Sequence, residues 1–250
     1  MACAGPRAVS EFRKVDIDRT ALLDTLAHRD NLLETAAGRI SVRVESDIFE
    51  SSFSADFFFS APDSFRANIR GMIGSVPASA VTIGDSTALF IPSKDSLYIA
   101  IDGEEENPVI GLRIGMADLV NALIGRLELA YDSLVSFDYE GQTAGLLLTD
   151  GFVFRRIEIL PSAWVPKSVQ IFSEDGSAII DIGYFDFVEI DGIIRPTKVM
   201  ITNPLRNEKV MIEVEREILG GTLPEGIFHL PVPDDVGIWY LSRRNDDNRR

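Results

Sequence analysis

The sequence of 250 residues has one cysteine and two histidines, so it is poor in the side chains that most often perform covalent chemistry. The single thiol, Cys3, excludes an intramolecular disulfide and a zinc site built from several cysteines. Neither His28 nor His229 belongs to a zinc-binding or nucleophile-elbow motif. No glycine-rich phosphate loop opens a helix after a strand. We therefore expect no catalytic residue, no metal and no cofactor, and a protein that is not an enzyme.

Positive charge and long apolar runs are also scarce. Lysine and arginine number 24 against 39 aspartates and glutamates, which gives a formal net charge of -15 and a pI near 4.5. That balance disfavours an electrostatic grip on nucleic acid or on anionic lipid head groups. No segment reaches the roughly 18 to 20 consecutive apolar residues that a spanning helix needs. We therefore expect that the protein has no nucleic-acid partner and that it is not an integral membrane protein of the helical class.

What the sequence does have is alternating apolar surface, clearest in residues 52–74. Two alternating segments are joined there by Pro62-Asp63 and closed by glycines, which predicts a β-hairpin. The apolar side chains of both segments fall on one face. The chain also has 15 phenylalanines against five tyrosines and two tryptophans, so most aromatic area lacks a polar group. We call this apolar face of the hairpin the wall; it consists of Phe53, Ala55, Phe57, Phe59, Phe65, Ala67 and Ile69. A wall of this kind suits either a large core or a lipid-accepting cavity.

The rest of the chain repeats this strand pattern, with two interruptions of helical period. Asp18 is a candidate N-cap for a helix to about Ala36. Residues 115–127 form a second amphipathic helix, with Met116, Leu119, Leu123 and Leu127 in its apolar stripe. Tight turns between about a dozen short strands predict an antiparallel meander, because parallel strands need crossover helices. We expect a mainly β (α+β) domain over residues 16–240, a flexible arm over 1–15 and a polar tail over 241–250.

The environment of Cys3 suggests a cellular location. Ala2-Cys3 followed by Ala4-Gly5-Pro6 resembles the start of a mature bacterial lipoprotein, whose cysteine carries the lipid. An ordinary cysteine beside a start methionine is the alternative interpretation. With an acylated Cys3, the arm over residues 1–15 would be the tether.

Taken together, the residues resemble the LolA/LolB-like lipoprotein-carrier superfamily, and more closely its less characterised outer-membrane lipoprotein members. The resemblance rests on the N-terminal helix, on PDSFRANIRGMIG at 62–74, on FVEIDGIIRPTKVMI at 187–201 and on GIFHLPVPDDV at 226–236. It implies a strongly curved antiparallel half-barrel of about ten to twelve strands, with the two helices as a lid. It also implies that acyl chains bind in an apolar cavity. That cavity would be lined by Phe53, Phe57, Phe59, Phe65, Ala67 and Ile69, and by Met116, Leu119, Leu123 and Leu127 of the lid.

The resemblance further implies a lipid-anchored protein of the bacterial outer membrane that faces the periplasm and takes part in lipoprotein or lipid trafficking. Val76, beside Pro77, would be the apolar tip of a membrane-contact loop. Arg43, Arg66 and Arg70 compete as the counterpart of the carrier's functional arginine. The alternative function is an envelope scaffold with the same fold, a filled core and protein partners. A hydrolase is a third possibility and would need a polar triad at the cavity mouth.

Overall fold

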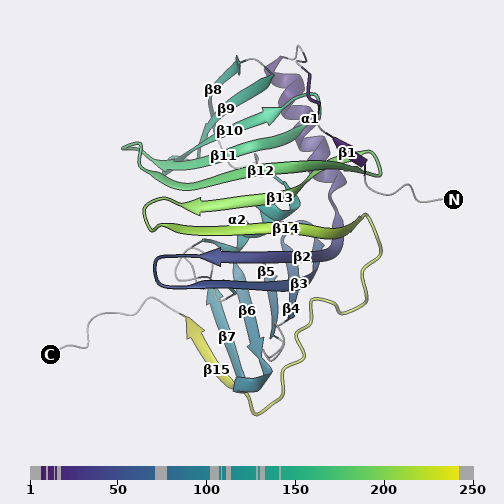
Figure 1. Ribbon diagram of the computed structural model, residues 1–250, viewed down its shortest axis with the longest axis vertical. Helices are drawn as coiled ribbons and strands as arrows, with labels where there is room; N and C mark the ends of the chain where they lie inside the picture. The colour runs from purple at the N-terminus through teal and green to yellow at the C-terminus, as the bar shows by residue number, and fades with distance from the viewer. Residues whose placement is uncertain are drawn as a thin grey trace.

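The computed structural model describes residues 7–9, 11–13, 15, 18–70, 78–101, 107, 109–110, 114–127, 129, 133–140 and 142–241. Fifteen strands and two α-helices are found in this part of the chain, and the predicted fold class is confirmed (Figure 1). The elements are β1 (Arg7–Val9), α1 (Arg19–Leu32), β2 (Thr35–Glu45), β3 (Glu50–Ser60), β4 (Ser64–Arg70), β5 (Ala78–Ile83), β6 (Ser86–Ile91), the short 3-10 helix η1 (Pro92–Lys94), β7 (Ser96–Ile101), α2 (Met116–Ile124), β8 (Ser133–Glu140), β9 (Thr143–Thr149), β10 (Val153–Leu160), β11 (Val165–Ser173), β12 (Ala178–Ile190), β13 (Ile193–Asn203), β14 (Glu208–Leu219) and β15 (Gly237–Leu241).

One sheet contains all the strands, and it consists of two meanders joined at a single seam. Its order is β15-β7-β6-β5-β4-β3-β2-β14-β13-β12-β11-β10-β9-β8, with β1 paired to β12. Strands β2 to β7 form one meander and β8 to β14 the other. The seam is the antiparallel pair β2 and β14, in which Val42 lies opposite Ile212 and Val44 opposite Val210. The two meanders thus meet through residues that are far apart in the sequence.

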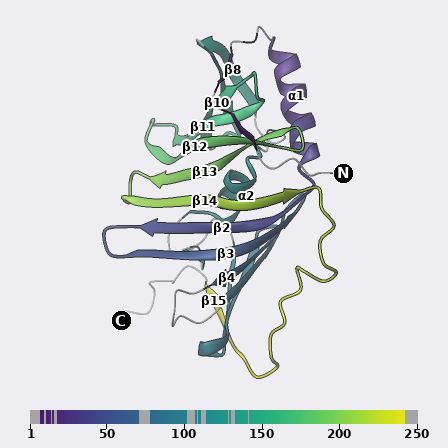
Figure 2. The same cartoon turned by 45° about the vertical axis from the view of Figure 1, so that its right-hand side comes forward.

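The sheet is strongly curved, and both helices lie on its concave side (Figure 2). Strand side chains alternate between the two faces, which places Phe57 and Phe59 of β3 on the concave face, where neither has any exposed surface. Leu22 and Leu26 of α1 and Leu123 of α2 complete the same core cluster. The concave face and the two helices therefore share one apolar core.

The two helices begin and end for local reasons. Asp18 caps α1, since its Oδ1 accepts the backbone N–H of Ala21 at 2.9 Å. The prediction that this helix continues to about Ala36 is wrong: α1 ends at Leu32, because residues from Thr35 onward pair as β2 with β3 and β14. Helix α2 ends at Ile124 and is capped by Gly125, whose φ of 71° is the left-handed conformation that glycine adopts readily.

Two short strands lie outside the sequence pattern. Strand β1 falls within the predicted arm and pairs with Phe187–Glu189 of β12. Strand β15 runs parallel to β7 at the sheet edge, and a long connection, residues 220–236, leads to it from β14. We call this connection the strap (Figure 1). Arg66 holds it to β4, with Nη1 donating to the backbone oxygens of Ile227 at 2.8 Å and His229 at 3.0 Å.

Candidate functional site

Nine of the ten predicted lipid-cavity residues lie in or against the larger core cluster, which fills the concave face and includes α2. Eight of them are buried, and Phe53 packs against the cluster while half-buried. Ile69, which is half-buried near the end of β4, does not belong to that cluster. The members at most 6% exposed are Phe57, Phe59, Phe65, Ala67, Met116, Leu119, Leu123 and Leu127.

An apolar cavity of about 40 Å³ separates α2 from β2, β3, β4 and β14. Every residue that lines it is apolar. About 10–15 Å³ of such free space holds one water molecule, so the cavity has room for only a few small groups. An acyl chain of ordinary length therefore needs α2 to move. The lining includes six of the predicted residues: Phe53, Phe65, Ala67, Met116, Leu119 and Leu123.

A second cavity of about 140 Å³ lies on the other side of α2, against β10, β11 and β12. Its floor is apolar and includes Ile157, Ile171 and Leu127, but Asn121 and Arg126 add polar groups. Helix α2 thus divides the concave face into a fully apolar compartment and an amphipathic one.

Two buried arginines hold the C-terminal end of α2. Arg195 on β13 is fully buried and donates from Nη2 to the backbone oxygen of Leu123 at 2.7 Å. Arg29 on α1 is 6% exposed and donates from Nη1 to the backbone oxygen of Gly125 at 2.8 Å. The last carbonyls of a helix lack intrahelical partners, so cationic donors satisfy them well. We call this arrangement the α2 clamp.

Carboxylates balance the clamp. Glu217 on β14 approaches Nη2 of Arg195 at 3.0 Å, and both side chains are buried. Burial raises the pKa of Glu217, and the Arg195 charge offsets part of that rise. Burial lowers the pKa of Arg29 to about 10, with the Arg195 charge as a second cause, so Arg29 stays protonated at neutral pH. Asp30 accepts the backbone N–H of Leu127 at 3.1 Å, which ties the segment after α2 to α1.

Neither clamp arginine is among the site residues predicted from the sequence. Arg29 has a recognisable signal, because it shares the spacing of Leu22, Leu26 and Leu33 on the buried face of α1. Arg195 shares a strand face with the buried Val199 and Ile201, because the three are even numbers of residues apart along β13, and this spacing is also visible in the sequence. Glu217 has no such signal: a register shift between Val214 and Arg216 turns it onto the concave face.

The three arginines that the sequence analysis proposed lie on the convex face, away from the α2 clamp. Arg66 binds the strap, Arg43 pairs with Glu45 at 2.7 Å and Glu50 at 2.6 Å, and Arg70 pairs with Asp56. None of them lines either cavity beside α2.

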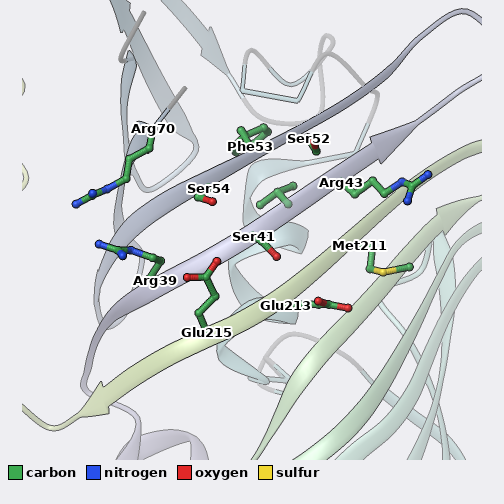
Figure 3. A pocket seen from close by; sticks show the side chains of 11 residues that line it. Arg39, Ser41, Arg43, Ser52, Phe53, Ser54, Arg70, Met211, Glu213 and Glu215 are labelled. Atoms are coloured by element: carbon green, nitrogen blue, oxygen red, sulfur yellow. The ribbon is translucent and has the colours of Figure 1, made fainter. Parts of the chain in front are cut away.

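Arg43 and Arg70 instead border an open polar hollow of about 670 Å³ over β2, β3 and β14 (Figure 3). Arg39, Arg70 and Glu215 surround one end of it. Asp56 beside it accepts from Nε of Arg39 at 2.9 Å and Nε of Arg70 at 2.8 Å. Burial alone would raise the pKa of Asp56, but these hydrogen bonds outweigh it and lower the pKa. The convex face is therefore ionic where the concave face is apolar.

The remaining residues considered from the sequence, namely Cys3, Val76 and the two histidines, do not line either cavity in the described structure. Cys3 and Val76 lie outside the described residues. His28 and His229 are exposed, and His229 lies in the strap. In the part of the chain that the structure describes, no group of three histidine, cysteine or acidic side chains could hold a metal ion. None of the described helices has the length and apolarity needed to cross a membrane.

Neither a family model nor a curated protein sequence matches the chain. Solved structures do. A Vibrio parahaemolyticus domain named for outer membrane lipoprotein sorting aligns with a TM-score of 0.66 at 12% identity, covering 84% of this chain and 95% of that one. A DUF1329 family protein from Desulfovibrio piger aligns with a TM-score of 0.65 at 9% identity, covering 84% of this chain and 96% of that one. A LolA superfamily protein from Nitrosomonas europaea aligns with a TM-score of 0.62 at 16% identity, covering 85% of this chain and 98% of that one.

These alignments define the class of architecture as a curved antiparallel sheet with helices on its concave face. The particular fold is the LolA/LolB-like fold, as the sequence resemblance indicated.

Proposed function

We propose that this protein is a non-enzymatic binding protein of the bacterial cell envelope that takes acyl chains of lipids or lipoproteins between the concave face and α2. The observation that carries the proposal is the lining of the 40 Å³ cavity, which is apolar throughout. The neighbours named for lipoprotein sorting and for the LolA superfamily support a role in lipoprotein or lipid trafficking.

Binding couples to displacement of α2. Each methylene group that leaves water contributes about 0.8 kcal/mol, so a chain of ten methylenes offers roughly 8 kcal/mol. Part of that free energy is consumed in moving α2, because the core must open and the α2 clamp must release the Leu123 and Gly125 carbonyls. The α2 clamp thus stabilises the form in which α2 lies on the concave face when no ligand is bound.

An acyl anchor on Cys3 would place the protein on the outer membrane, facing the periplasm, with Val76 as a further membrane contact. The described chain is attached to the sheet from Arg7 onward, where β1 pairs with β12. Four residue steps separate Cys3 from Arg7, a reach of about 14 Å at full extension. The anchor would therefore hold the β1 side of the sheet near the lipid.

Native mass spectrometry and titration with a fluorescent fatty-acyl probe test acyl binding. Ala67→Met fills the cavity from β4 and is expected to weaken probe binding about tenfold. Ser52→Met, on the convex side of the neighbouring β3, is the matched control and should bind like the unmodified protein. Absence of any acyl ligand together with no probe affinity would refute the proposal.

A scaffold with a filled core is the second candidate, and the small volume of the cavity favours it. It predicts that Ala67→Met changes stability and nothing else, and that proteins rather than lipids co-purify. The probe titration separates the two candidates, since only the acyl-binding protein responds to the probe.

A further inference from the structure

The cavity of about 140 Å³ between α2 and strands β10, β11 and β12 has the composition of a ligand site, and we call it the amphipathic cavity. Its floor consists of strand residues such as Ile157, Ile171 and Ile182, each at most 9% exposed. Polar groups join the lining from α2 and from the segment after its cap, through Asn121 and Arg126. The space holds roughly ten groups of the size of a water molecule. An apolar floor with a few polar groups is typical of sites that bind small molecules.

A buried tyrosine adds a hydroxyl group to the amphipathic cavity. Tyr184 on β12 lines the cavity and is 3% exposed. Within the described part of the chain, its hydroxyl group forms no hydrogen bond. Burial raises the pKa of Tyr184, so the hydroxyl keeps its proton at neutral pH. Buried tyrosine hydroxyls usually have a hydrogen-bond partner, so this one is available to an acceptor atom of a ligand.

Arg126, which also lines the amphipathic cavity, has no counter-ion among the described residues. Its Nη1 donates to the backbone oxygen of Pro62 at 2.5 Å, and its guanidinium lies 5.8 Å from the centre of the Phe59 ring. Its Nε is buried and has no hydrogen-bond partner. Because Nη1 is engaged, the edge formed by Nε and Nη2 remains. That edge matches the two oxygens of a carboxylate.

The other charges around the amphipathic cavity balance one another. Asp118 and Arg155 line it with opposite charges, and each interacts with a further group of the protein. The two arginines of the α2 clamp each have a carboxylate beside them. Asn121 is half-buried, and its side-chain amide is a neutral donor that hydrogen-bonds to none of the described residues. The charge of Arg126 is therefore left over, and the cavity favours an anionic group over a neutral or cationic one.

We propose that the amphipathic cavity binds the carboxylate of a free fatty acid, with Arg126, Tyr184 and Asn121 as its hydrogen-bond donors. This inference rests on the proposed acyl binding and names the class of ligand. The first methylene groups lie on the apolar floor, and the rest of the chain extends beneath α2 towards the fully apolar cavity of 40 Å³. An acyl group in an ester or amide has no negative charge at this position. The site therefore prefers a free fatty acid to the acyl groups of a lipoprotein.

Fluorescence titration with cis-parinaric acid and with its methyl ester, at neutral pH, tests the role of the carboxylate. The unmodified protein should bind the acid about tenfold more tightly than the ester, because only the acid accepts charge-assisted hydrogen bonds. Arg126→Met should weaken binding of the acid about tenfold and change binding of the ester by less than about twofold. Arg206→Met, at an exposed arginine in the turn between β13 and β14, makes the same change in net charge and should alter neither affinity.

Two further variants test the other donors without removing a large side chain. Asn121→Asp keeps the size of the side chain and adds a negative charge, so it should weaken binding of the acid about tenfold and spare the ester. Tyr184→Phe removes only the hydroxyl group and should weaken binding of the acid about threefold. Thermal unfolding followed by circular dichroism establishes that each variant is folded.

Acetate has the carboxylate without the chain and should not displace the acid probe. Equal affinity of the unmodified protein for acid and ester would overturn the proposal while leaving acyl binding in place. The same holds for an equal loss of acid and ester binding in Arg126→Met and Asn121→Asp, and for displacement of the probe by acetate. Failure of both probes to bind the unmodified protein would instead contradict acyl binding itself, and the assignment of the amphipathic cavity with it.

Discussion

Arg195 reaches from near the start of β13 to the last turn of α2 and donates to the backbone oxygen of Leu123 at 2.7 Å. The residue belongs to the sheet, yet its hydrogen bond fixes the helix that covers the sheet. Glu217 on the neighbouring β14 balances its charge at 3.0 Å. One guanidinium therefore joins the seam region of the sheet to the end of α2, and the position of α2 depends on it.

Replacing Arg195 by methionine should destabilise the protein by about 3–5 kcal/mol, because Glu217 is left charged and buried without its partner. Urea unfolding followed by circular dichroism measures the change. The double variant Arg195→Met with Glu217→Met should recover much of the loss, since neither charge then remains in the core. Equal stability of the single and double variants would show that the pair does not act as a unit.

Leu119→Ala should enlarge the apolar cavity beside α2 and lower the free energy of unfolding by about 2–5 kcal/mol, as truncation of a buried leucine does. The larger space should also speed uptake of a fatty-acyl probe in stopped-flow fluorescence, because less displacement of α2 is needed. Leu205→Ala is the control: that side chain is 67% exposed, and its loss should cost no more than about 0.5 kcal/mol.

Gly38→Ala should be strongly unfavourable at the seam. A Cβ there would lie 2.2 Å from the backbone oxygen of Arg216 and 2.8 Å from the ring of Phe57. Moving β14 away would open the pairing with β2, so we expect a loss of at least about 1–3 kcal/mol in thermal or denaturant unfolding. Gly221→Ala meets only Ile218 at 3.4 Å and should be much better tolerated.

Asp56→Asn should make the free energy of unfolding less dependent on pH in the acid range. The folded-state pKa of Asp56 is lowered, so its contribution is present above the unfolded value of about 3.9 and disappears as the pH falls through the folded value. The variant should be less stable by about 1 kcal/mol at pH 7 and equal to the unmodified protein in strong acid. Unfolding curves from pH 2 to 7 measure this difference. Asp24→Asn, on the exposed side of α1, should leave the shape of that pH profile unchanged.

Much of the fold follows from the sequence, because strand and helix periods are local. The wall from Phe53 to Ile69 pairs as predicted, with Phe57 opposite Ala67 and Phe59 opposite Phe65. Alternation along β14 also predicts its buried face, since Val210 and Ile212 are buried. The predicted end of α1, at about Ala36, is too far along the chain because residues around Ala36 suit a helix equally well. Pairing with β3 and β14 makes this segment a strand.

The site was only partly predictable. The apolar lining could be named from its period, but the α2 clamp depends on Glu217, whose orientation follows from a register shift that no residue pattern reveals. Strand β15 was missed for a related reason: five residues form a strand there because β7 offers them an edge, and the strap that brings them to it has no periodic pattern.

The seam between the two meanders also bears on how the chain folds. Within each meander the paired strands are close neighbours in the sequence, so their contacts can form early at little cost in chain entropy. The β2 and β14 pair instead joins residues such as Ile40 and Val214, and closing so long a loop is slow. We therefore expect one late event, the zipping of the seam, to set the folding rate, and the concave face to take shape only when that event is complete.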